Sequence, residues 1–430
     1  ATINNQGTAT NFGATGSASW TTTVKTSGFT AVAGEGYFVN TTSGAISVNL
    51  PAGTAGAVVA FKDYANTFDT NPVTLVQNGS DKIGGSTDNA QLLTEGIAVT
   101  LVFVDSTKGW LVTDSGLQEE APNPTFITAT GGTVTTVDTN FKVHTFTGPG
   151  TFTVCSVGNA AGSNSVDYLV VAGGGSGGYA NGGGAGGGAG GLRYSASTYS
   201  NPSPSGGSAG TAVPVTATGF PIVVGAGGGA KSGSPQYKRG DQGSTSSFST
   251  ISSAGGGGGG GGCTCSTQVG GDGGSGGGGG KDFPSSAAGG SGNTPATNPS
   301  QGNPGGTGGG PGPLNNRGGG GGGHAQPGNN ATGSGPVCSG GGGAGGNGSV
   351  VAINGSCAAY AGGGGGQNEN GPVQGAGGSG GGGAGAAPGN NGNAGSTNTG
   401  GGGGGADSAP AGQQTGAGGS GIVIIRYKFQ

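Results

Sequence analysis

The segment "DYLVVAGGGSGGYANGGGAGGGAGG", residues 167–191, decides how this chain folds. An apolar run typical of a buried β-strand passes without a break into glycine. The chain closes with the same two parts in reverse order, "GGSGIVIIRYKF" at residues 418–429. We expect Tyr168–Val171 to pair with Ile422–Tyr427, because each run is apolar enough to need a partner. This pairing would join the two borders of the glycine-rich tract and make the tract a folded unit.

Glycine is concentrated in the second part of the chain. The sequence has 117 glycines in 430 residues, of which 21 lie in residues 1–172 and 96 in residues 173–430. No strict three-residue repeat holds and proline is scarce, so the tract is not a collagen helix. Glycine blocks alternate with polar connectors such as "SGSPQYKRGDQGS" and "QNENGPVQ". This alternation predicts a chain that folds back on itself through roughly ten to twelve extended polyglycine-II rods.

Backbone hydrogen bonds must hold such rods together. Ordering the backbone of one residue costs about 1–2 kcal/mol, and glycine loses the most freedom. Rods with almost no side chains bury little apolar surface, whereas each inter-rod N–H···O=C bond contributes about 0.5–1.5 kcal/mol net. Nearly every amide must therefore be paired. A larger side chain at an inner position would push the rods apart, so we expect larger residues on the outside of the bundle or at the rod ends.

The first part of the chain is typical of a small all-β module. Apolar runs such as "GYFVN", "AVVAFKDY" and "AVTLVFVD" are separated by turn signals, and helix signals are missing. Trp110 is expected to pack in the core or at a subunit interface rather than to serve as a sugar platform. The residues expected in the core of this module are Phe38, Leu50, Val59, Phe61, Leu75, Leu101, Phe103 and Trp110.

These patterns predict an all-β N-terminal module followed by a glycine-rich bundle of polyglycine-II helices with a closing C-terminal strand, and essentially no α-helix. Pro122 and Pro124 mark a linker between the two parts, because proline interrupts strand pairing. The expected divisions are an N-terminal attachment segment (1–28), the β-module (29–118), a linker with strands leading into the bundle (119–172), and the bundle (173–430) with its terminal strand at 421–429.

Composition argues against several classes of protein. Thirteen Lys and Arg are spread thinly against 17 Asp and Glu, so no nucleic acid is expected as a partner. No apolar run approaches the roughly 20 residues of a membrane-spanning helix, so no membrane insertion is expected. His144 and His324 lack the paired spacing of a metal site. We therefore expect no metal, no cofactor, no catalytic residues and no enzyme activity; a depolymerase within the β-module is the weakest alternative.

Five cysteines raise the question of disulfides. Cys263 and Cys265 stand two apart and seldom join each other, so a bridge from this pair to Cys338 or Cys357 is the more plausible arrangement. The odd count, which includes Cys155, leaves at least one thiol free.

Sparse aromatic residues in or beside the connectors are the candidate receptor contacts. Aromatic faces with Asn, Gln and Ser nearby suit sugars or protein loops. The alternative is that these rings pin the connectors onto the ends of the bundle. The triplet Arg239-Gly240-Asp241 is interpreted as a chance match to an adhesion motif. The candidates are Tyr179, Tyr194, Tyr199, Tyr237, Phe283 and Tyr360.

Both parts of the chain resemble known families. The stretch "GYFVNTTSGAISVNLPAGTAGAVVAFKDYANTF" resembles β-modules of tailed-phage fibre and virion-appendage proteins, which commonly attach or oligomerise. The motifs "VDYLVVAGGGSGG", "PIVVGAGGGA" and "GGSGIVIIRY" resemble the glycine-rich domain of phage and marine-bacterial surface proteins. This half is also similar to the tip adhesins of T-even-like long tail fibres, whose polyglycine helices stack and whose end loops bind the host.

The resemblance implies a virion protein, on a tail fibre or the capsid surface and exposed outside the cell. It would be a fibre or tip adhesin whose residues 1–118 bind other virion or filament subunits and whose connectors bind a host-surface glycan or outer-membrane protein. It also implies a homo-oligomer, a trimer among the possibilities. The alternative is a purely structural role, as a capsid or tail decoration protein or a subunit of an extracellular filament.

Overall fold

The chain forms two compact units, which are described separately. They comprise residues 1–123 and 124–430. No α-helix occurs among the described residues, as the sequence predicts. The computed structural model describes residues 2–3, 9–10, 18–117, 124–195, 209–262, 267–281, 286–309, 316–332, 340–369, 371, 373–408 and 412–430.

The first unit is built from two sheets, with a short additional pair, β1 (Thr2–Ile3) and β2 (Ala9–Thr10), near its start. The five-stranded sheet has the order β11 (Trp110–Leu117), β10 (Ile97–Phe103), β7 (Val58–Asp63), β5 (Glu35–Val39) and β3 (Ser19–Lys25). The four-stranded sheet has the order β4 (Phe29–Thr30), β6 (Ile46–Asn49), β8 (Val73–Val76) and β9 (Ala90–Leu92).

Successive strands from β3 to β8 alternate between the two sheets. β3, β5 and β7 therefore pair in parallel within one sheet, and β4, β6 and β8 pair in parallel within the other. Parallel neighbours need a crossover connection, which is usually a helix. Here a strand of the opposite sheet makes each crossover, so a parallel arrangement forms without any helix in this unit's described residues.

The core of the first unit lies between these sheets. Seven of the eight expected core residues are buried, including Trp110, which is fully buried. Phe38 is the exception and corrects the prediction. Tyr37 and Val39 point into the core, so the alternation of a strand places Phe38 on the opposite face, 5.1 Å from the ring of Trp20.

The first unit also begins earlier than the expected boundary at residue 29. β3 is an edge strand of the larger sheet and pairs with β5 from Ser19 onward. Part of the segment 1–28, the strand Ser19–Lys25, therefore pairs with the larger sheet of this module.

The second unit contains two larger sheets at its base. One has the order β12 (Thr128–Thr130), β15 (Gly150–Ser156), β20 (Gly219–Val223), β21 (Ser246–Phe248) and β22 (Ile251–Ser253). The other has the order β13 (Thr133–Val137), β14 (Phe141–Phe146), β26 (Ile422–Lys428), β16 (Ser165–Val171) and β18 (Leu192–Tyr194), and β19 (Val213–Pro214) also pairs with β16. Two small pairs are β17 (Tyr179–Ala180) with β25 (Ala406–Asp407) and β23 (Ser349–Val351) with β24 (Ala358–Tyr360).

The pairing expected at the borders of the glycine tract is confirmed. β16 and β26 are antiparallel neighbours, with Tyr168 opposite Ile425 and Val171 opposite Ile422. Both strands are buried on both faces: Val170 and Val423 pack in one hydrophobic cluster, and Leu169 and Ile424 pack in another. This two-sided burial explains why the two runs are apolar throughout rather than alternating.

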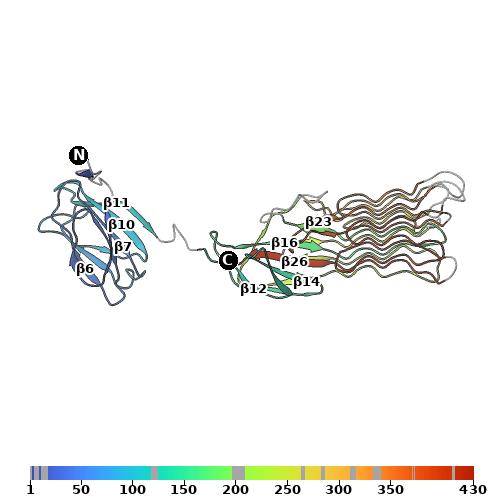
Figure 1. Ribbon diagram of the computed structural model, residues 1–430, viewed down its shortest axis with the longest axis horizontal. Helices are drawn as coiled ribbons and strands as arrows, with labels where there is room; N and C mark the ends of the chain where they lie inside the picture. Colours follow the sequence, from blue (N-terminus) through green and yellow to red (C-terminus); the bar gives the residue numbers. More distant parts are fainter. Residues whose placement is uncertain are drawn as a thin grey trace. The chain divides into compact units, whose positions relative to one another are not determined.

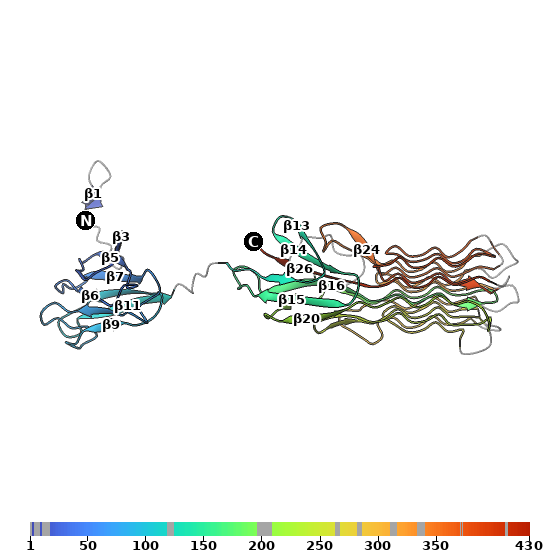
Figure 2. The same ribbon diagram turned by 90° about the horizontal axis from the view of Figure 1, so that it is seen from below.

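Extended rods run from this base and turn back at the far end (Figures 1 and 2). Their hydrogen bonds repeat every third residue. The amides of Gly173, Ser176 and Tyr179 donate to the carbonyls of Ser244, Asp241 and Lys238. These acceptors are also three residues apart, on one neighbouring rod. The next set, Gly174 and Gly177, donates to a second rod at Gly419 and Gly416; the set Gly175 and Gly178 donates to a third rod at Gly188 and Ala185. Three residues per turn is the repeat of a polyglycine-II helix.

The central rod, residues 184–191, shows how complete this pairing is. Its amides donate to three neighbouring rods, through acceptors such as Gly260, Gly319 and Gly403. Its carbonyls accept from three others, through donors such as Gly175, Gly278 and Gly364. Six rods therefore surround one, and the expectation that peptide groups find partners on adjoining rods is confirmed. Some rods also contain little glycine: "RGDQGS" at 239–244, the second half of an expected connector, pairs with a neighbouring rod through Gly240 and Gly243.

Close packing of backbone explains the glycine content. A Cβ atom at Gly186 would lie 2.0 Å from the carbonyl oxygen of Gly364, and one at Gly187 would lie 2.2 Å from that of Gly175. Contacts this short cannot be relieved by moving a side chain, because both neighbours are backbone. Alanine is the largest residue in 184–191, and larger buried residues such as Tyr179 and Arg317 lie at rod ends, as expected.

Candidate functional site

Connectors at the distal end of the bundle, the end away from β16 and β26, form the candidate site. β17 and β25 lie there, because the rod that follows β16 reaches Tyr179 only after two helical turns of glycine. Among the described residues, the distal turns include 180–183, 231–238, 387–391 and 407–408. The rods between them hold these turns in fixed positions relative to one another.

Ionisable side chains of the bundle gather toward this end. Rod interiors exclude side chains larger than alanine or serine, so charged residues can be accommodated only at turns or on outer faces. Arg193 and Asp272 lie at the sheet end instead. The distal set is Lys231, Lys238, Arg239, Asp241, Lys281, Arg317, Glu369 and Asp407.

The turn at Gly182 and Gly183 is the centre of the distal end. Both residues have positive φ angles, +80° and +77°, which glycine adopts without strain. The Gly182 amide donates to Oδ1 of Asp407 at 3.0 Å, and the Gly183 amide donates to Oε1 of Gln367 at 2.7 Å. Asp407 and Gln367 are both buried. A Cβ at Gly182 would lie 2.3 Å from Oε2 of Glu369, whose carboxylate would have to move to make room.

A polar network surrounds this turn. Asn316 donates its amide to the carboxylate of Glu369, and the buried guanidinium of Arg317 donates from Nη1 to the carbonyl of Thr332 at 2.8 Å. Asn368 donates from Nδ2 to the carbonyls of Gly340 and Val373, at 2.9 and 3.2 Å. Buried polar side chains thus tie several distal connectors to one another, where the rods alone leave amides and carbonyls at their ends.

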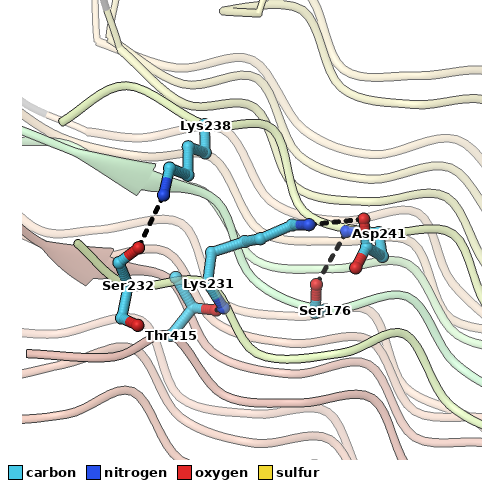
Figure 3. A network of polar contacts seen from close by, with 6 residues as sticks. All are labelled: Ser176, Lys231, Ser232, Lys238, Asp241 and Thr415. Atoms are coloured by element: carbon cyan, nitrogen blue, oxygen red, sulfur yellow. Dashed lines mark hydrogen bonds and ion pairs between the residues drawn. The ribbon is translucent and has the colours of Figure 1, made fainter. Parts of the chain in front are cut away.

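A second network lies on the flank of the bundle (Figure 3). Nζ of Lys231 is 2.6 Å from Oδ1 of Asp241, and both side chains are partly exposed. The Lys231 amide donates to Oγ1 of Thr415, and the Asp241 amide donates to Oγ of Ser176, both at 2.8 Å. Lys238 donates from Nζ to the carbonyl of Ser232 at 2.6 Å, which closes the connector between them.

The triplet Arg239-Gly240-Asp241 is not presented on a loop. The Gly240 amide donates to Gly259 within the bundle, and a Cβ there would lie 2.1 Å from the carbonyl oxygen of Ser176. The carboxylate of Asp241 forms an ion pair with Lys231.

The structure separates the six aromatic candidates. Tyr179 is buried at the distal end, and its backbone pairs with Lys238. Tyr194 and Tyr360 are buried at the sheet end, in the cluster that covers β16 and β26, and burial raises the pKa of both. These three rings therefore pack at rod ends, and their role as receptor contacts stays a prediction. Tyr237 is half-buried in the distal connector 231–238. Tyr199 and Phe283 lie outside the described residues.

Both histidines are buried, and the two described cysteines are exposed. Burial lowers the pKa of His324 to about 4, and its Nδ1 is 2.6 Å from Oγ of Ser349. Burial also lowers the pKa of His144. Cys155 and Cys357 are exposed free thiols, so a bridge to Cys357 does not form. Cys263, Cys265 and Cys338 lie outside the described residues.

In the described parts of the chain, no group of three or more His, Cys, Asp or Glu side chains is placed to hold a metal ion. The described residues likewise include no helix of the length and apolarity that a membrane span requires. Sequence reasoning missed the distal polar network, although "NGGG" at 181–184 and "GQNE" at 366–369 stand where rods end.

Comparisons with known proteins agree with the division into two units. Residues 2–116 match the family model "Bacteriophage T4 gp9/10-like protein, N-terminal". A stretch of 72 residues is 42% identical to the baseplate wedge protein gp10 of Enterobacteria phage T4, and the match covers 16% of this chain and 12% of that protein. Residues 145–428, more than half of the chain, match the family model of the glycine-rich domain. The chain, with its bundle of polyglycine rods closed by β16 and β26, therefore belongs to the glycine-rich domain family.

Proposed function

We propose that this protein is a structural component of a phage tail that presents a host-binding surface. Its first unit attaches it to other virion subunits, and the glycine-rich bundle carries the distal connectors to a receptor on the host cell. The bundle contributes rigidity and position, and the connectors contribute the contacts.

The first unit supports the attachment role. It resembles the N-terminal region of phage T4 gp9/10-like proteins, and part of its sequence is similar to a baseplate wedge protein. Large apolar side chains on its surface, Trp20 at 43% exposure and Val112 at 57%, are suited to contacts with other subunits.

The sorting of side chains along the bundle is the observation that carries the receptor-binding role. Rod interiors are close-packed backbone, in which an added Cβ would meet a neighbouring carbonyl, whereas most charged side chains of the bundle lie at or beside distal turns. The exposed turns 232–236 and 387–391 can vary in sequence without disturbing the rods, because the rods pair mainly through their backbone. A rigid scaffold with variable loops at one end is a common arrangement for recognition surfaces.

Adsorption of the full-length protein to a panel of bacterial strains tests the proposal. One variant replaces connectors 232–236 and 387–391 with Gly-Ser sequences of equal length, and a matched control replaces residues 397–399 at the sheet end. We expect saturable binding to at least one strain, lost in the distal variant and kept in the control. Thermal unfolding of each variant verifies that the bundle stays folded.

The alternative is a structural role without receptor contact. It would be favoured if no strain bound the protein, or if the distal replacement left adsorption unchanged while the protein appeared in regular copies on the particle in electron micrographs.

A further inference from the structure

A cleft opens between the two sheets at the sheet end of the second unit. Its volume is about 570 Å³, within the range of sites that hold small ligands. Tyr168 and Arg193 line it from one sheet, Ile251 lines it from the other, and Asn298 and Pro299 form a third wall. This cleft is separate from the distal connectors.

A smaller pocket adjoins the cleft. Tyr168, Arg193, Gly210 and Pro299 line both of them, and Ser300 lines the pocket alone. The volume of the pocket is about 10 Å³, which is room for one water-sized group. A ligand that lies in the cleft can therefore place one oxygen atom in this pocket.

Arg193 faces the cleft because side chains alternate along β18. Leu192 and Tyr194 pack in the buried cluster on one face of the sheet, so Arg193 lies on the other face. Its Nη2 donates to the carbonyl of Asn298 at 3.4 Å, a long contact with a neutral acceptor. No described residue forms an ion pair with Arg193. The connection 196–208 has no Asp or Glu in its sequence, so it supplies no counter-charge.

The hydroxyl of Tyr168 is the second polar group at this position. Burial raises the pKa of Tyr168, and the positive charge of Arg193 opposes that rise, because the guanidinium lies near the hydroxyl. The hydroxyl forms no hydrogen bond with any described residue. A Cβ at Gly210 would lie 2.5 Å from the hydroxyl oxygen, so glycine at that position leaves the hydroxyl accessible from the cleft.

Hydrogen bonds hold the walls of the cleft in place. Oδ1 of Asn293 accepts the amides of Thr297 and Gln301, at 3.0 and 3.2 Å, and so fixes the loop that forms the third wall. On the opposite side, the Gly210 amide donates to the carbonyl of Tyr194 at 2.7 Å. A cleft that is formed in advance loses little conformational entropy when it binds a ligand.

Much of the remaining lining is aliphatic, from Val213, Pro214, Ile251 and Pro299. The lining offers no exposed aromatic face for a sugar ring, since the side chain of Tyr168 is buried. A guanidinium with a hydroxyl beside it matches the two oxygens of a carboxylate. Polar groups at one end and aliphatic walls along the rest favour a carboxylate attached to an aliphatic group.

We propose that this cleft binds an aliphatic carboxylate, either the C-terminal residue of a polypeptide or a free acid. Arg193 donates charge-assisted hydrogen bonds to the carboxylate, and the hydroxyl of Tyr168 donates to one of its oxygens. The aliphatic group lies against Val213 and Ile251. The inference does not depend on the proposed function, because it involves none of the distal connectors.

Isothermal titration calorimetry of the full-length protein tests the inference with two carboxylates and their neutral amides. The small pair is isocaproate and isocaproamide. The peptide pair is an N-acetylated pentapeptide that ends in leucine, with a free or an amidated C-terminus. We expect the carboxylates to bind at least about tenfold more tightly than their amides at low salt. Tighter binding of the free-ended peptide than of isocaproate assigns the cleft to a chain terminus, and equal binding assigns it to a free acid.

Two variants test the residues. Arg193→Gln removes the charge but keeps a hydrogen-bond donor, and it should weaken carboxylate binding about tenfold. Tyr168→Phe removes only the hydroxyl and should weaken binding about fivefold. The matched control is Lys142→Gln, which removes a positive charge from β14, a strand of the same sheet that β26 and β16 separate from β18. Its effect should be less than about twofold.

Equal binding of a carboxylate and its amide, binding of neither carboxylate, or full affinity in Arg193→Gln overturns the inference. Thermal unfolding shows whether each variant is folded. If Arg193→Gln does not fold, Tyr168→Phe decides, and full affinity in that variant then overturns the inference. Adsorption to cells is measured separately, so failure of the carboxylate site leaves the proposed function standing.

Discussion

The two units of this chain achieve order by opposite means. The first unit packs side chains such as Phe61 and Leu101 between two sheets, and its backbone is paired mainly within strands. The bundle has almost no side chains inside, and its rods pair in up to six directions through backbone alone. The first unit should therefore lose stability when atoms are removed from a core side chain. The bundle should lose stability when a Cβ atom is added at an inner glycine.

Substitution of an inner glycine is the strongest test of this contrast. Gly186→Val would place Cβ 2.0 Å from the carbonyl oxygen of Gly364, so at least two rods must separate. We expect a loss above about 4 kcal/mol in the free energy of unfolding, or failure of the bundle to fold. Hydrogen exchange measured by mass spectrometry reports this as lost protection across residues 173–421.

The control for this variant is Gly229→Ala, on an outer rod where the nearest atom to a new Cβ is a carboxylate oxygen of Asp241 at 3.4 Å. Its stability should change by less than about 1 kcal/mol. Equal tolerance at both positions would contradict backbone close packing as the source of order.

Removal of a large side chain tests the first unit. Phe61 is fully buried between the sheets, so Phe61→Ala should cost about 3–5 kcal/mol. Because the chain forms two compact units, the substitution should lower the denaturant midpoint of the first unit's unfolding transition and leave the midpoint of the bundle's transition unchanged. A shift of the bundle transition by the same amount would mean that the two units fold as one.

Acid should affect the second unit through His324. The pKa of His324 is about 4 in the folded protein and about 6.5 when unfolded, because burial disfavours the charged ring. Between these values the unfolded chain binds a proton that the folded chain does not, so stability falls as pH decreases from about 6.5 to 4, by up to about 1.4 kcal/mol per pH unit.

The variant His324→Asn should flatten this dependence, as measured by the unfolding midpoint of the second unit at pH 7 and pH 4.5. An unchanged slope in the variant would assign the acid sensitivity to another group, such as His144, whose pKa is also lowered by burial.

The smallest effect is expected at the exposed ion pair on the flank of the bundle. Asp241→Asn removes the contact with Lys231 but keeps the backbone bonds of both residues. Stability should fall by less than about 1 kcal/mol, and the difference should vanish at high salt. A larger loss that persisted in salt would mean that side chains hold the outer rods as well.

The sequence predicted those parts of the fold that follow directly from its composition. Apolar runs at both borders of the tract had to pair, and glycine without a collagen repeat left backbone pairing as the only source of order. The sequence does not reveal the strand Ser19–Lys25, because this strand is rich in threonine and lies at a sheet edge. Few of its side chains are buried there, so no clear alternation of apolar and polar residues arises. Phe38 was misjudged because alternation within a short strand can be read in either register.

The candidate site was harder to predict. The sequence shows where a connector lies along the chain but not at which end of the bundle it emerges, and Tyr194 and Tyr360 proved to belong to the buried sheet end. The distal gathering of charge arises only from the folding back of the rods, because Lys281, Arg317 and Glu369 are far apart in sequence yet close around Gly182 and Gly183.

The three-residue repeat of the rods restricts how such a protein changes in length. Adding one residue inside a rod would turn every later amide by about 120° and direct it to the wrong neighbour. Only additions in multiples of three preserve the partners, and a rod lengthened in this way needs the rods around it to lengthen too. Deletions and insertions should therefore be found at the turns, which leaves the reach of the bundle constant while its tips diversify.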